Sequence, residues 1–117
     1  MTKENIEAGA KHDKGKPKVY SGVMRYFPRA IIEIARVSEH GASIHKWNTW
    51  DTIENPLERY SNASIRHELS QCMGVKFDAE SKIIEQAHVA WNDLARLELM
   101  LRDIERSKNI EENFIIY

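Results

Sequence analysis

The chain has 117 residues, of which 42% are hydrophobic and 30% are charged, and its 17 basic side chains nearly balance 18 acidic ones. This composition is typical of one globular domain, and the net charge of −1 argues against a domain held to nucleic acid by its overall field. The single cysteine excludes an intrachain disulfide, and no apolar run suits a signal peptide or a membrane helix, so we expect a cytoplasmic protein.

Residues 1–19 are polar, and we expect them to form an extended or looped arm. The stretch KHDKGKPK (11–18) places four lysines around Asp13, with a glycine and a proline among them. Lysine supplies positive charge and glycine lets backbone N–H groups approach, so Lys11, Asp13 and Lys16 are candidate substrate-binding residues for a phosphate. A P-loop is not matched, because proline follows Lys16. A solvated, lysine-rich terminus is the competing interpretation.

Three helices are expected to follow this arm, with an aromatic turn before the first of them. Their predicted bounds are 28–41, 55–74 and 79–107. Pro28 and Pro56 mark the first two starts, because proline suits the first turn of a helix. Asp78 and Ser81 provide the start signal of the third helix.

The fold that these elements predict is all-α. We expect one helical domain over residues 1–117, with a polar N-terminal arm, three principal helices, a long third helix and an apolar tail at 108–117. One apolar stripe runs along the third helix and comprises Ile83, Ala87, Ala90, Leu94, Leu97 and Leu101. Leu99 and Met100 add apolar groups on another side. This surplus of apolar surface predicts a homo-oligomeric helical bundle.

A polar stripe lies roughly opposite, where Glu85, His88 and Asn92 are spaced i, i+3, i+7. Periodicity alone favours a solvated face for these side chains. Val89 and Met100 lie at the edges of the stripe, however, and would suit the wall of a cleft. The Glu-x-x-His spacing also lets a carboxylate and an imidazole share one metal ion.

The second helix carries a histidine that can face this stripe. The short connection to the third helix predicts an antiparallel pair, in which His67 and His88 face each other. Asp78 and Glu80 would then lie at the hairpin end, and imidazoles with carboxylates suit a divalent metal or a general base. The candidate catalytic residues are His67, His88 and Glu85. The candidate metal ligands are Asp78, Glu80 and His88, with Mg²⁺ or Mn²⁺ as the expected ion of an enzyme and no cofactor for simple binding. Solvated faces with local ion pairs are the alternative.

The loop predicted at 41–54 is rich in aromatic residues, with Trp47 and Trp50. An exposed tryptophan can stack on a nucleobase, so Trp47 is a candidate substrate-binding residue. Tryptophans in loops also anchor the loop to the core, which is the alternative.

Five segments, in this order and spacing, resemble one known family. They are GAKHDKGKP (9–17), HGASIHKWN (40–48), RHELSQCMG (66–74), FDAES (77–81) and AHVAWN (87–92). The family occurs mainly in bacteriophages and is described as the N-terminal domain of dATP/dGTP diphosphohydrolases, formerly a domain of unknown function. The resemblance covers nearly the whole chain, and it implies purine deoxynucleoside triphosphates as the substrate class.

The resemblance also assigns individual positions. The family's N-terminal signature is matched by Lys11, Asp13, Gly15 and Lys16, and its aromatic loop by Trp47. Its Arg-His pair is matched by Arg66 and His67, and its D-x-E-S by Asp78, Glu80 and Ser81. The end of its H-x-x-H-x-x-x-N is matched by His88 and Asn92. Arg66 and Asn92 thereby join the candidate substrate-binding residues. Two positions depart from the pattern: Glu85 stands for the first histidine of the last motif, and Lys82 for a glycine. Glutamate can still coordinate a metal.

Three functions compete on this basis. The first is a metal-dependent pyrophosphohydrolase that cleaves a (deoxy)purine nucleoside triphosphate to the monophosphate and pyrophosphate. The second is a non-catalytic protein that sequesters a nucleotide, such as a cyclic nucleotide signal of host antiviral defence, in the cytoplasm of an infected bacterial cell. The third is an interaction protein without a nucleotide ligand. No membrane or nucleic acid polymer is expected as a partner.

Overall fold

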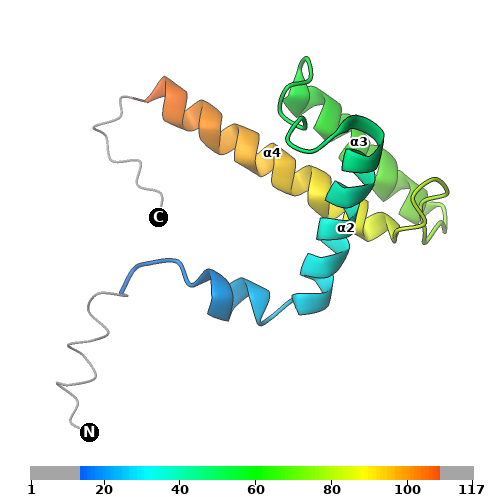
Figure 1. Ribbon diagram of the computed structural model, residues 1–117, viewed down its shortest axis with the longest axis horizontal. Helices are drawn as coiled ribbons and strands as arrows, with labels where there is room; N and C mark the ends of the chain where they lie inside the picture. The colour runs from blue at the N-terminus through cyan, green and yellow to red at the C-terminus, as the bar shows by residue number, and fades with distance from the viewer. Residues whose placement is uncertain (1–13, 109–117) are drawn as a thin grey trace, which may run out of the picture.

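The computed structural model describes residues 14–108, which fold into helices joined by loops (Figure 1). The elements in chain order are the π-helical turn η1 (Tyr20–Met24), α2 (Pro28–His45), α3 (Pro56–Cys72) and α4 (Glu85–Ser107). Within this range there is no strand, and a single isolated β-bridge pairs Phe77 with Ile84. The prediction of an all-α fold with three principal helices and a long last helix is confirmed. None of the described helices has the length and hydropathy that a membrane crossing requires.

The predicted helix starts at Pro28 and Pro56 are confirmed, but two other boundaries were wrong. α2 continues to His45, past the predicted end at Gly41. One glycine inside a helix is unfavourable by only about 1 kcal/mol, which the packing of α2 against α4 can outweigh. The predicted loop is therefore shorter than 41–54 and contains residues 46–55.

α4 begins at Glu85 and not at residue 79, because the expected start signals serve a loop instead. The side chain of Asp78 accepts a hydrogen bond from the backbone N–H of Ser81. The backbone N–H of Asp78 donates to the carbonyl of Ile83, and Lys82 adopts a left-handed φ of +65°. These bonds close residues 78–83 into a compact turn, so the connection between α3 and α4 is longer than predicted.

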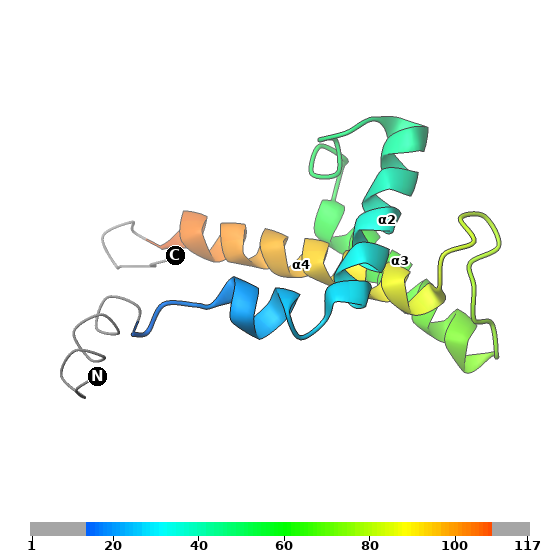
Figure 2. The same cartoon turned by 60° about the horizontal axis from the view of Figure 1, so that its bottom comes forward.

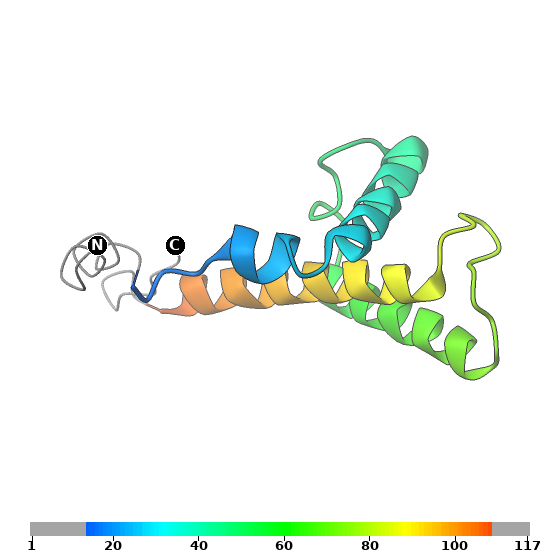
Figure 3. The same cartoon turned by 90° about the horizontal axis from the view of Figure 1, so that it is seen from below.

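α3 and α4 form an antiparallel hairpin, and α2 crosses α4 on another side (Figure 3). The buried apolar cluster lies at that crossing and contains Val37, Ile83 and Ala87, with Ile84 and Trp91 packed against it. The C-terminal half of α4, drawn in orange, continues beyond α3 (Figure 2). The packing therefore covers mainly the N-terminal half of α4.

The polar stripe of α4 has the opposite environment to the one that periodicity favoured, whereas the apolar stripe is buried at Ile83 and Ala87 but not along its whole length. Glu85 is 3% exposed, His88 7% and Asn92 5%, so the solvated face expected from the pattern alone is wrong. In the apolar stripe, by contrast, Leu94 is 52% exposed and Leu97 53%. The reason is that α3 presents polar side chains to α4, and they pair with the polar stripe.

Candidate functional site

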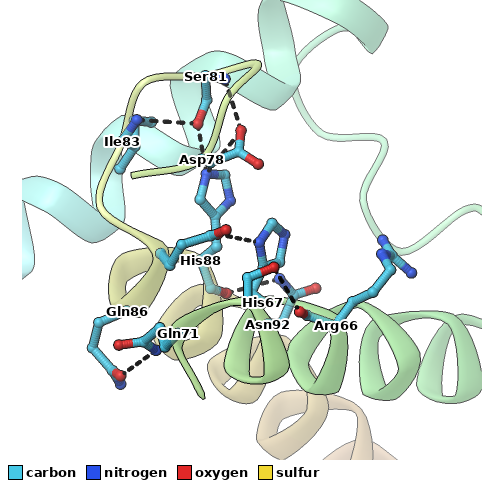
Figure 4. A network of polar contacts seen from close by, with 11 residues as sticks. Arg66, His67, Gln71, Asp78, Ser81, Ile83, Gln86, His88 and Asn92 are labelled. Carbon is cyan, nitrogen blue, oxygen red and sulfur yellow. Dashed lines mark hydrogen bonds and ion pairs between the residues drawn. The ribbon is translucent and has the colours of Figure 1, made fainter. Parts of the chain in front are cut away.

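The centre of the site is a pair of histidines from neighbouring helices (Figure 4). His67 of α3 and His88 of α4 stack with their ring centroids 4.4 Å apart and their planes 13° from parallel. Nδ1 of His67 donates to Oε1 of the buried Glu85 at 2.6 Å. His67 and His88 thus lie face to face, as the antiparallel hairpin predicted.

The turn before α4 supplies the other side of the site. Oγ of Ser81 lies 2.7 Å from Nε2 of His88, and Oδ2 of Asp78 lies 3.9 Å from the same nitrogen. Glu80 belongs to the same turn but points elsewhere: its Oε1 lies 3.3 Å from Nε2 of His40 on α2. Asp78 and Ser81 therefore reach the histidines, whereas Glu80 does not join them.

The environment fixes the charges of two of these groups. Burial, followed by the nearby His67, lowers the pKa of His88 below its ordinary value of 6.5. Burial alone would raise the pKa of Asp78, but hydrogen bonds from Ser81 and the adjacent histidines outweigh it and lower the pKa below 3.8. At neutral pH the site therefore contains a neutral His88 next to an ionised Asp78.

Three side chains of the site could bind one metal ion. One ligand atom from each of His67, Asp78 and Glu85 lies within 4.8 Å of the other two. An imidazole with two carboxylates is a donor set that suits divalent ions such as Mn²⁺, and the carboxylates also suit Mg²⁺. This set shares Asp78 with the metal ligands proposed from the sequence, but it contains His67 and Glu85 in place of His88 and Glu80.

Polar contacts outside the histidine pair hold the hairpin in register. Oγ of Ser64 donates to Asp93 at 2.7 Å, and Nε2 of Gln71 donates to Gln86 at 2.8 Å. Ser64 is itself buried. Because these bonds flank the His67–Glu85 contact, they fix the rotation of α3 about α4 and hence the positions of both ligand-bearing faces.

A cavity of about 460 Å³ opens beside the histidines, between α2, the loop 46–55 and α4. His88 and Asn92 form part of its wall, so the cavity reaches the histidine pair at His88, whereas His67, Asp78 and Glu85 do not line it. Its aromatic lining consists of Trp47, Trp50, Tyr60 and Trp91. Polar and charged side chains, among them Ser38, Lys46 and Glu80, complete the lining. A concave site that combines aromatic surface with polar groups is typical of sites that bind small molecules.

Two of the four aromatic residues owe their places to hydrogen bonds. The hydroxyl of Tyr60 donates to the backbone carbonyl of Trp50, and burial raises the pKa of this tyrosine. Nε1 of Trp91 donates to Oγ of Ser38 at 2.6 Å. The rings of Trp50, Tyr60 and Trp91 then meet at tilted or edge-to-face angles with centroids 5.4–6.4 Å apart. Trp50 is thus an anchor of the loop, whereas Trp47 stays 61% exposed.

Arg102 on α4 contacts the loop 46–55 through Asp51 and Trp50. Nη1 of Arg102 donates to Asp51 at 2.9 Å, and the guanidinium lies 5.1 Å from the ring centroid of Trp50. The hydrogen bond to Arg102, the largest effect, lowers the pKa of Asp51, and that same bond raises the pKa of Arg102. Sequence patterns did not single out Arg102, because its partner lies 51 residues away in the chain.

The structure describes only some of the residues proposed to bind phosphate. Arg66 is exposed, and no described residue accepts a hydrogen bond from its side chain or pairs with its charge. Lys16 is also exposed. Lys11 and Asp13 lie outside the described residues, and so does the tail beyond residue 108. Arg66 directly precedes His67 on α3 (Figure 4).

Comparison with known proteins agrees with the motif order. The family described as "dATP/dGTP diphosphohydrolase, N-terminal" matches residues 6–109. No curated protein and no solved structure matches the chain. The matched range contains the histidine pair, the turn that carries Asp78, the aromatic loop and the whole of α4. The chain therefore belongs to the family of dATP/dGTP diphosphohydrolase N-terminal domains.

Proposed function

We propose that the protein is a metal-dependent pyrophosphohydrolase of (deoxy)purine nucleoside triphosphates, active in the cytoplasm of a phage-infected bacterial cell. The observation that carries the proposal is the partly buried cluster of His67, Asp78, Glu85 and His88, which meets the aromatic cavity at His88. A carboxylate such as Glu85 is seldom buried at 3% exposure unless a partner or a function requires it. The family description supports the choice of purine deoxynucleotides.

The donor atoms of His67, Asp78 and Glu85 would hold one divalent ion, Mn²⁺ or Mg²⁺. When bound, such an ion supplies a Lewis acid for phosphate oxygens and makes its water more acidic. The two carboxylates offset the positive charge of the ion. Ser64–Asp93 and Gln71–Gln86 keep the two helices in place around it, so the ligands are oriented before an ion arrives.

Hydrolysis to a monophosphate requires a base and a counter-charge. His88 is neutral at physiological pH because its pKa is lowered, so it can accept the proton of an attacking water. The water oxygen forms a bond to the α-phosphorus, and the bond from that phosphorus to the bridging oxygen breaks. The electron pair of the broken bond leaves with pyrophosphate. Arg66, whose guanidinium is free of other described partners, would neutralise the phosphates.

The test is incubation of the purified protein with dGTP, dATP, dCTP and dTTP, in Mn²⁺ or Mg²⁺ and in EDTA, followed by chromatography of products. We expect metal-dependent cleavage of the purine nucleotides, reduced roughly 10²-fold or more in Glu85→Gln. Glu68→Gln is the matched control, because Glu68 is exposed on α3 and has no hydrogen bond or ion pair with a described residue. Cleavage in EDTA, or equal loss in both variants, would contradict the proposal. A nucleotide that co-purifies intact would instead support sequestration.

A further inference from the structure

We infer that the aromatic cavity binds the purine base, and that Oδ1 of Asn92 reads a ring-edge N–H of that base. The inference rests on the proposed function, because it assumes that a nucleotide lies with its phosphates at the histidine pair. It adds to that function the group that recognises the base. It also separates two tasks along α4: Glu85 and His88 act on the phosphates, and Asn92 acts on the base.

The hydrogen bonding of Asn92 leaves one atom available. Its Nδ2 donates to the backbone carbonyl of His88 at 2.8 Å, and this bond fixes which end of the amide is oxygen. No described residue donates a hydrogen bond to Oδ1. The residue is nevertheless buried, with 5% of its surface exposed. A buried amide oxygen without a protein donor is uncommon, since such groups are normally paired.

The cavity offers space for a hydrogen-bond donor to Oδ1 of Asn92. Asn92 is part of the cavity wall, and no fully shielded side-chain oxygen or nitrogen of the described residues lacks a hydrogen-bond partner. Oδ1 must therefore retain access to solvent, and the cavity is where this side chain meets open space. A carbonyl oxygen in that position accepts a hydrogen bond, so its ligand must present an N–H or O–H donor. Adenine presents its 6-amino group, and guanine presents ring and amino N–H donors.

The rest of the cavity suits a flat heterocycle. Trp47 leaves most of its indole exposed at the cavity, while Trp50, Tyr60 and Trp91 hold one another in place. Stacking of a base on an aromatic side chain contributes about 1–3 kcal/mol. The backbone just before Trp47 is also strained, because Lys46 has a φ of +117° and a ψ of 156°, a region that side chains rarely adopt. Strain of this kind is concentrated at sites that must present a side chain in one orientation.

A second polar group of the wall complements Asn92. Oγ of Ser38 accepts the hydrogen bond from Trp91, so its own proton remains available to a ring nitrogen or carbonyl of a base. Asn92 and Ser38 thus offer an acceptor and a donor that match the mixed edge of a purine, beside further polar groups of the wall such as Lys46 and Glu80. Asn92 follows His88 by one turn of α4, about 6 Å along the axis. The base-reading group is therefore adjacent to the cluster but separate from it.

The experiment measures affinity rather than turnover, using non-hydrolysable α,β-methylene analogues in Mn²⁺ and isothermal titration. The better-bound of the dATP and dGTP analogues is compared with the purine deoxyriboside analogue, whose base has no ring-edge N–H. We expect the wild-type chain to bind the purine analogue about 10-fold or more weakly, since a buried acceptor is left unpaired. In Asn92→Leu this ratio should fall to near one. Asn62→Leu, at an exposed position of α3, is the matched control and should keep the wild-type ratio.

Three results would overturn the inference. The first is equal wild-type affinity for the dATP or dGTP analogue and the purine deoxyriboside analogue, and the second is an unchanged ratio of these affinities in a folded Asn92→Leu variant. The third is that the wild-type chain binds neither the dATP nor the dGTP analogue. If Asn92→Leu does not fold, the wild-type ratio and Trp47→Ala decide, because Trp47 is exposed and should lose affinity without unfolding. The inference and the proposed function can fail separately. If the protein discriminates between the analogues but cleaves no nucleotide, the base site is supported and the hydrolase activity is not. If it cleaves nucleotides but does not discriminate, the hydrolase activity is supported and the base site is not.

Discussion

His67 on α3 and Glu85 on α4 are joined by a 2.6 Å hydrogen bond between Nδ1 and Oε1, and the carboxylate is 3% exposed. Removing one partner of a buried pair usually leaves the other uncompensated, so this contact ties the stability of the hairpin to the chemistry of the site. The motif that the chain resembles has a histidine at the position of Glu85, and a glutamate there still offers a group that can contact His67 and bind a metal ion.

The first prediction concerns metal binding without substrate. Mn²⁺ at a hundredfold excess over its dissociation constant should stabilise the wild-type chain by about 2.7 kcal/mol. Glu85→Gln should lose most of this gain, because an amide is a weaker ligand than a carboxylate. Differential scanning fluorimetry with Mn²⁺ and with EDTA gives the comparison, and Glu68→Gln is the control. A full Mn²⁺ shift in Glu85→Gln would show that the ion binds elsewhere.

The second prediction concerns pH. The folded-state pKa of His88 is lowered, so an unfolded chain takes up a proton near pH 6.5 that the folded chain does not. The stability of the metal-free protein should therefore fall as the pH decreases from about 7.5 to 5.5. Asp78, whose pKa is also lowered, adds a loss in the same direction at more acidic pH, below its ordinary value of 3.8.

The measurement for this prediction is the denaturation midpoint across that pH range in EDTA. His88→Gln keeps an amide that can bond to Ser81 but has no proton to take up. The variant should have a flatter pH dependence than the wild-type chain. Identical slopes would mean that His88 titrates normally in the folded state.

The third prediction concerns the aromatic loop. Arg102→Ala removes the hydrogen bond to Asp51 and the cation over Trp50, so the loop should open more often. We expect weaker nucleotide binding and faster proteolysis between residues 46 and 55. Arg106→Ala is the control, because the only ion-pair partner of Arg106 among the described residues is the exposed Asp103, 3.9 Å away. Equal protease sensitivity of the two variants would argue against the anchor.

The fourth prediction concerns self-association. Leu94 and Leu97 of the apolar stripe of α4 are exposed, as is Ile104 further along the helix, and exposed apolar surface on a helix is typical of an interface. We expect the chain to be a homo-oligomer, and Leu97→Glu should shift it toward monomer. Light scattering after size exclusion measures the mass. A wild-type mass of 13.6 kDa at micromolar concentration would contradict the expectation.

The sequence predicted those parts of the fold that depend on local chemistry. Pro28 and Pro56 start helices because proline fits the first turn in any context. Asp78 and Ser81 were assigned to a helix start, but the same side chains can also close a turn, and only the contacts with His88 decide between the two.

The site was harder to predict, because periodicity reveals that a helix has two faces but not which face is covered. The polar stripe of α4 is buried because Ser64 and His67 arrive from α3 with matching groups. The pairing of Glu80 with His40 and of Ser38 with Trp91 joins positions 40 and 53 residues apart, which no local pattern encodes. The short connection between the second and third helices, in contrast, predicted the antiparallel pair in which His67 and His88 face each other, with Asp78 at the hairpin end.

The most direct test of the central claim is hydrolysis of dGTP in ¹⁸O-labelled water with Mn²⁺, with mass spectrometry of both products. Attack of water on the α-phosphorus predicts one labelled oxygen in dGMP and none in pyrophosphate. Label in the pyrophosphate, release of inorganic phosphate alone, or recovery of intact dGTP would contradict the proposed reaction.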